Sequence, residues 1–172
     1  MVEQRSHNPL VVGSTPTGPT MPVSPKSRLR PLIVGESNPY GGDPYFALYP
    51  APDGCSGHRL CCLILGMRRA SYLASFDRCN LCDGPWSGAV ASDRARQLLA
   101  GAVPRFILLG SKVCFAFGVP YRPFTRVGAC VILPHPSGRC RRWDVPGAIA
   151  EARECIRLAV PEVAHLIGVV GE

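Results

Sequence analysis

Short apolar segments alternate with polar loops rich in glycine and proline from residue 31 onward. Apolar runs of four to eight residues, bounded by such loops, are typical of strands that are covered on both faces. The pattern predicts four strands, at residues 32–34, 76–81, 105–110 and 127–133. The third is apolar almost throughout, as expected of a strand with helices on either side.

Between these strands, apolar residues recur at three- and four-residue steps, which is the helical period. Leu60, Ile64 and Met67 have this spacing and predict a helix over residues 56–67. Further helices are predicted over residues 92–102, where Ser92 offers an N-cap, and over 111–117 and 146–158. Strands that alternate with helices predict an α/β fold, a three-layer α/β/α sandwich with a central four-stranded parallel sheet. Ligands of such sheets bind beyond the carboxyl ends of the strands.

The chain divides into two parts of different composition. Residues 1–30 contain five prolines between Pro9 and Pro25 and show no sustained period, which predicts a disordered, proline-rich basic arm. An arm that holds phosphates is the functional alternative. Residues 31–172 predict one globular domain with its own core.

Charge and cysteine content narrow the class of protein. The formal net charge of +7 favours a polyanionic partner, of which nucleic acid is the commonest. The apolar runs are too short to span a bilayer and no signal-peptide pattern opens the chain, so we expect a cytoplasmic protein without membrane contact. The nine cysteines are odd in number, and Cys79 and Cys82 form the one Cys-x-x-Cys pair, so we expect neither a disulfide framework nor a metal or other cofactor.

Unusual residues stand at the end of each of the four predicted strands. The first reads Gly-Glu-Ser-Asn-Pro-Tyr-Gly over residues 35–41, and the last reads His-Pro-Ser-Gly-Arg over 135–139. Asn80 closes the second strand, and the third strand runs into Leu-Gly-Ser-Lys at 109–112. In this order and spacing the four features resemble the motifs of the uracil-DNA glycosylase superfamily over about residues 31–160. The first motif is one residue longer than its common forms, which leaves open whether Glu36 or Asn38 is the counterpart of the water-positioning residue.

The resemblance implies an enzyme of base excision repair that flips a uracil or a related pyrimidine out of DNA and hydrolyses its N-glycosidic bond. Glu36 or Asn38 would orient the attacking water, and His135 would donate a hydrogen bond to the departing base. Asn80, with one acceptor and two donors, would read the uracil edge. Phe46 or Tyr49 would stack under the base.

The last motif also supplies the residues expected to touch DNA. They are Ser137, Gly138, Arg139, Arg141 and Arg142, which could enter the minor groove or meet phosphates. No lysine stands inside the motifs at 35–41 and 135–139 to form a Schiff base, so a monofunctional enzyme is expected. We also expect a monomer. A non-catalytic DNA-binding module with the same fold, and an enzyme of free nucleosides, are the alternatives.

Overall fold

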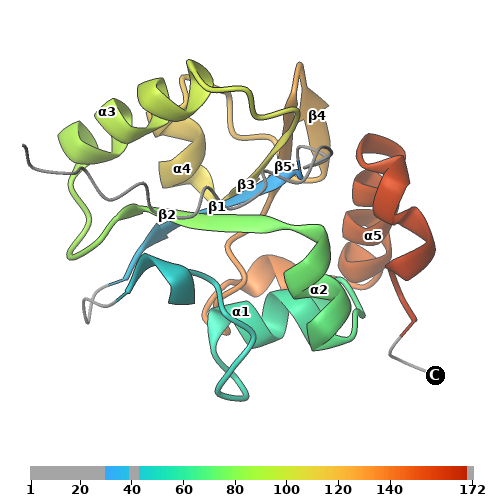
Figure 1. The fold of residues 1–172 in the computed structure, drawn as a ribbon. Coiled ribbons are helices and arrows are strands. Elements are labelled where there is room, and N and C mark those ends of the chain that lie inside the picture. The colour runs from blue at the N-terminus through green and yellow to red at the C-terminus, as the bar shows by residue number, and fades with distance from the viewer. Residues whose placement is uncertain (1–29, 39–42, 170–172) are drawn as a thin grey trace, which may run out of the picture.

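The computed structural model describes residues 30–38 and 43–169 (Figure 1). The predicted arm, apart from Arg30, therefore lies outside the described residues, as do Pro39 and Tyr40 of the first motif. The α/β class is confirmed, since strands and helices alternate along the described chain around one sheet.

The sheet has five strands in the order β2-β1-β3-β5-β4. Their bounds are β1 (Leu32–Ser37), β2 (Asp77–Cys82), β3 (Phe106–Leu109), β4 (Thr125–Val127) and β5 (Cys130–Leu133). Strands β2, β1, β3 and β5 pair in parallel, whereas β4 pairs with β5 in antiparallel register. The sheet is thus mixed, and the prediction of four strands was incomplete. The predicted strand 127–133 is broken at Gly128, whose φ of 58° allows the tight turn between β4 and β5.

Successive residues of the strands face two separate cores. Ile33, Ile107 and Val131 point to one side, with Leu60 and Ile156 from the helices there. The residues next to them on the strands, Val34, Leu108 and Ile132, point to the other side. This alternation follows from the two-residue period of a strand, and it explains why nearly every strand position is apolar.

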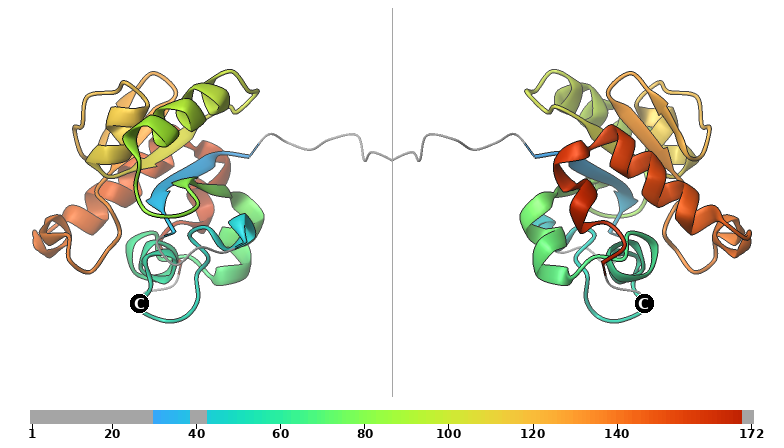
Figure 2. Two further views of the ribbon diagram at one scale, coloured as in Figure 1. Left: turned by 90° about the vertical axis from the view of Figure 1, so that its left-hand side faces the viewer. Right: turned by 90° about the vertical axis from the view of Figure 1, so that its right-hand side faces the viewer.

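Helices cover both faces of the sheet, as Figures 1 and 2 show. On one face lie α1 (Ser56–His58), the π-helical turn η2 (Arg59–Ile64), α2 (Arg69–Ser75) and α5 (Ala148–Ala159). On the other lie α3 (Gly88–Leu99) and α4 (Ser111–Ala116). Three short 3-10 helices complete the described elements: η1 (Pro44–Phe46), η3 (Arg141–Asp144) and η4 (Pro161–Leu166).

The helix boundaries differ from the sequence prediction by a few residues. The helix predicted over 56–67 ends at Ile64, and Gly66, with a φ of 61°, turns the chain toward α2, which the pattern did not reveal. Helix α3 begins at Gly88 rather than near Ser92, because the buried Ala91 belongs to the helical face that packs on the sheet. None of the described helices has the length and apolar character needed to cross a membrane.

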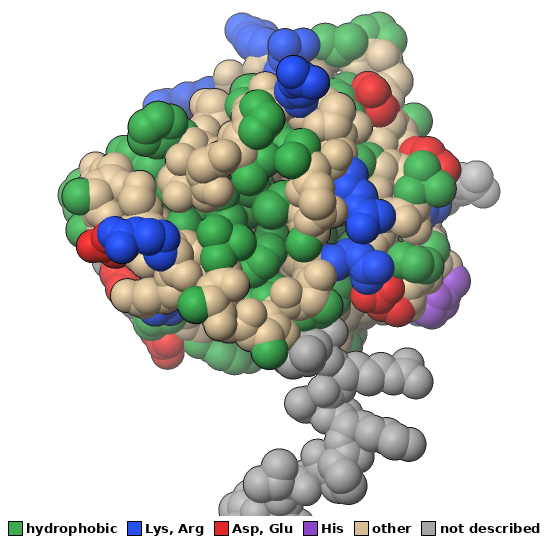
Figure 3. Space-filling view, turned by 90° about the horizontal axis from the view of Figure 1, so that it is seen from above, with side chains coloured by type: hydrophobic (Ala, Val, Ile, Leu, Met, Phe, Trp, Pro, Cys, Tyr) green, Lys and Arg blue, Asp and Glu red, His purple; other side chains and the backbone are tan. Residues whose placement is uncertain are grey.

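The outer face of the α3–α4 layer carries hydrophobic side chains near its centre, with Lys and Arg side chains around them (Figure 3). Phe115 is the most exposed large hydrophobic residue among those described, at 78%.

Candidate active site

A cavity of about 660 Å³ lies at the carboxyl ends of the central strands. Residues from the ends of β1, β2 and β5 and from the segment 46–57 line it. Seven of the predicted site residues share this one cavity: Glu36, Asn38, Phe46, Tyr49, Asn80, His135 and Ser137. The sequence thus named side chains that the fold brings together from segments 100 residues apart.

Asn80 is positioned by a glycine on the neighbouring strand. Gly35 is its partner in the parallel register of β1 and β2. A Cβ atom on Gly35 would lie only 2.3 Å from Asn80 Oδ1. The amide of Asn80 therefore lies across β1 in space that the missing side chain of Gly35 leaves open. The glycine that opens the first motif allows this close approach.

His135 is fixed through both its ring and its backbone. Its Nδ1 accepts a hydrogen bond of 3.1 Å from the backbone N–H of Ser137, and its carbonyl oxygen accepts one of 2.8 Å from Trp143 Nε1. A neutral ring that accepts at Nδ1 carries its proton on Nε2, which is then a donor. Burial lowers the pKa of His135, the nearby Lys112 charge lowers it further, and the Glu36 charge opposes both. The lowered pKa and the backbone N–H that donates to Nδ1 both favour the neutral ring.

Arg59 also contacts the loop that contains His135. Its Nε donates a hydrogen bond of 3.0 Å to the carbonyl oxygen of Pro136, and its guanidinium lies beside Gly138. Within the loop, Ser137 Oγ accepts from the backbone N–H of Arg139 at 3.2 Å. The sequence pattern did not indicate Arg59, because it lies 77 residues away from its partner.

Glu36 forms an ion pair that the sequence also did not indicate. Its Oε2 lies 3.2 Å from Lys112 Nζ, and the two side chains are 21% and 53% exposed, respectively. The same Nζ lies 5.5 Å from the centre of the Trp86 ring. Lys112 lies just beyond the carboxyl end of β3, and this end lies on the same side of the sheet as the carboxyl end of β1. This position was the signal that could have identified Lys112.

An aromatic group borders the cavity on the side of η1. The rings of Phe46 and Tyr49 are 5.5 Å apart at a near-perpendicular angle, and Phe46 is 55% exposed. The backbone beneath them is anchored to α2, since Tyr72 donates a hydrogen bond of 3.2 Å to the carbonyl oxygen of Leu48. Leu48 itself has a φ of 51°, an uncommon conformation that this anchoring maintains.

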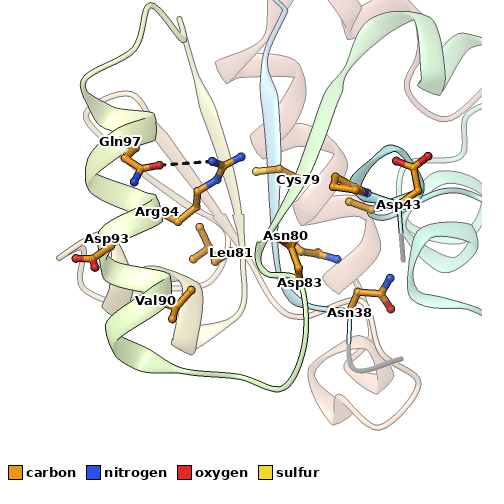
Figure 4. A pocket seen from close by; sticks show the side chains of 12 residues that line it. Asn38, Asp43, Cys79, Asn80, Leu81, Asp83, Val90, Asp93, Arg94 and Gln97 are labelled. Carbon is orange, nitrogen blue, oxygen red and sulfur yellow. Dashed lines mark hydrogen bonds between the residues drawn. The ribbon is translucent and has the colours of Figure 1, made fainter. Parts of the chain in front are cut away.

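A second cavity, of about 290 Å³, lies on the other side of Asn80 and shares Asn38 and Asn80 with the first (Figure 4). Helix α3 forms its outer wall, where Arg94 donates a hydrogen bond of 3.5 Å to Gln97 Oε1. Asn38 therefore borders both cavities, whereas Glu36 lines only the first.

Four of the residues predicted to touch DNA do not line either cavity. Gly138, Arg139, Arg141 and Arg142 are exposed on the surface that follows the His135 loop. Arg141 forms an ion pair of 3.3 Å with Asp144, whose carboxylate offsets part of its charge.

The cysteines give no sign of a metal centre in the part of the chain that the structure describes, where no three His, Cys, Asp or Glu side chains are grouped for one. Cys79 and Cys82 lie on β2 as free thiols, and burial raises the pKa of Cys79 to about 11.

No family model, curated protein or solved structure matches this chain. The functional interpretation therefore depends on the residues of the site and their geometry.

Proposed function

We propose that this protein is a monofunctional DNA glycosylase that hydrolyses the N-glycosidic bond of uracil, or of a related pyrimidine, in DNA. The observation that carries the proposal is the cavity itself. An amide, a carboxylate and a neutral histidine border it from the ends of three strands, Asn80 on β2, Glu36 on β1 and His135 after β5. This reaction needs one group to read the base, one to assist water and one to stabilise the departing base.

Bond cleavage leaves negative charge on the base and positive charge on the sugar. The Nε2–H of a neutral His135 is suited to donate to the base oxygen as that charge develops. Asn80 supplies one acceptor for the uracil N3–H and a donor for O4, the reverse of what cytosine requires. Phe46 and Tyr49 offer aromatic faces or edges for the flipped base.

Glu36 and Asn38 are the two candidates for the residue that orients the attacking water, and the geometry favours Glu36. Lys112 engages Oε2, while Oε1 lies on the side of Gly110, whose missing Cβ would be 3.2 Å both from this oxygen and from His135 Cβ. Oε1 and His135 Cβ thus lie on the same side of Gly110, and both residues line the cavity. A carboxylate also polarises a water toward a developing cation, whereas the amide of Asn38 can only position it.

The test is release of uracil by protein purified from a host that lacks its own uracil-DNA glycosylase. Single- and double-stranded oligonucleotides with one uracil are incubated with excess enzyme, and abasic sites are revealed by alkaline scission. Glu36→Gln, purified in parallel, is the control for contaminating activity. Scission by the wild-type protein and a much lower, residual rate in the variant support the proposal. DNA retardation without scission indicates a non-catalytic binding module and overturns the glycosylase proposal. The absence of both scission and retardation overturns it as well.

A further inference from the structure

Lys112 contacts the end of β1 and the loop that follows β2, although the sequence pattern gave it no role. Its ammonium group pairs with Glu36 at the end of β1 and lies over Trp86, in the loop that follows β2. It is the second residue of α4, in the segment that follows β3. One cation thus lies between the carboxylate at the end of β1 and the loop that follows the strand of Asn80.

Lysine is a rare residue in this chain. Lys26 and Lys112 are its lysines, and all other cationic side chains are arginines. A lysine presents a compact charge on a flexible stem, whereas an arginine presents a planar fork. The carboxylate of Glu36 is only 21% exposed, so water weakens this ion pair less than it weakens an exposed one.

We propose that Lys112 is a positioning residue for the reaction, which acts through Glu36. By engaging Oε2 it fixes the orientation of the carboxylate, with Oε1 near Gly110 and His135. Glu36 and His135 both line the cavity in which the attacking water would lie. This inference rests on the proposed glycosylase function. It assigns Lys112 no contact with the base and no covalent step.

The same charge acts on His135. The charged groups that face this histidine are Glu36 from β1 and Lys112 from α4, with Arg59 from η2 against the following residue of the loop. Removal of the Lys112 charge leaves the negative charge of Glu36, which stabilises the protonated ring. The pKa of His135 is therefore expected to rise. A residue that served only to hold the fold would not change this value.

The first experiment is a double-mutant cycle on single-turnover uracil release. Lys112→Gln is expected to lower the rate about tenfold, and Lys112→Arg, which keeps an ion pair, is expected to retain most of it. In a Glu36→Gln background, Lys112→Gln should have no further effect. Arg96→Gln, which removes one exposed charge on α3, is the matched control and should keep the wild-type rate. An equal loss in both backgrounds, with a shallower salt dependence, would show that Lys112 binds DNA instead.

The second experiment needs no activity. The ring signals of His135 are titrated by NMR in the wild-type protein and in Lys112→Gln, with His135→Gln used to assign them. A higher pKa in Lys112→Gln supports the coupling, and an unchanged pKa overturns it. If the wild-type protein releases no uracil, the glycosylase proposal fails, while this measurement still decides whether Lys112 acts on the pKa of His135.

Discussion

Gly35→Ala tests the placement of Asn80 more directly than any change to Asn80 itself. The added Cβ would lie 2.3 Å from Asn80 Oδ1 and 3.3 Å from Leu48 Cδ1. Ordinary contact requires about 3.4 Å, so the amide must move by about 1 Å. A displacement of that size at a reacting or recognising group costs about 10²-fold in rate, or about 2.7 kcal/mol of transition-state stabilisation.

The cost in stability should be much smaller. The clashing atom is the end of a side chain that can rotate toward the cavity, so we expect the free energy of unfolding to fall by only about 1 kcal/mol, the low end for an overpacked site. Gly88→Ala is the matched control, because a Cβ there meets nothing within 4 Å. It should keep the wild-type rate and leave the melting temperature equal or slightly higher, because alanine loses less backbone entropy on folding.

Single-turnover release of uracil and urea unfolding are measured on the same preparations. In an Asn80→Ala background the effect of Gly35→Ala on the rate should disappear, because the displaced group is gone. A Gly35→Ala protein with the wild-type rate would refute the idea that Asn80 reads the base from this position. A loss that persists without Asn80 would assign the effect to Leu48 and the cavity wall.

Four further predictions concern the same site. His135→Ala should lower the single-turnover rate by about 10²–10³ with little change in DNA affinity measured by gel retardation, and a normal rate would make the histidine structural. Asn80→Asp should lose uracil release and gain slow release of cytosine, since an ionised carboxylate only accepts hydrogen bonds; full uracil release with an unchanged melting temperature would place Asn80 away from the base. Because the pKa of His135 is lowered from its ordinary 6.5, the unfolded chain takes up this proton first, so the free energy of unfolding should decline as the pH falls below about 6.5 and decline less in His135→Gln; equal slopes in urea titrations would contradict this. Borohydride added with abasic DNA should trap no adduct, because the Lys112 amine pairs with Glu36 instead of attacking the sugar, and a covalent complex by gel would show lyase activity.

The sequence by itself determined the α/β class and the positions of the strand ends. The apolar runs at 32–34 and 106–109 needed no context, because a strand covered on both faces must be apolar at nearly every position. The chain order of strands and loops then placed Glu36, Asn80 and His135 at the carboxyl end of the parallel strands, and the 660 Å³ cavity that all three residues line agrees with that placement. That these residues act on a pyrimidine in DNA stays a prediction.

The sequence failed where local pattern and tertiary packing disagree. Strand β4 is three residues long and includes the polar Thr125 and Arg126, so its pairing with β5 gives stability that no period reveals. Helix α2 follows a turn at Gly66 and contributes Tyr72 to the core, although its apolar residues are too few for a clear helical pattern.

Only the tertiary structure decided which side chains meet within the site. The period of a strand tells which face a residue occupies, but lateral register tells which residue lies beside it, and register arises from packing of the whole sheet. Gly35 beside Asn80, Lys112 beside Glu36 and Arg59 beside Pro136 all join segments that are distant in the chain. These contacts orient the amide, the carboxylate and the histidine loop. Each depends on the distance between neighbouring strands and helices, a quantity that the linear sequence does not contain.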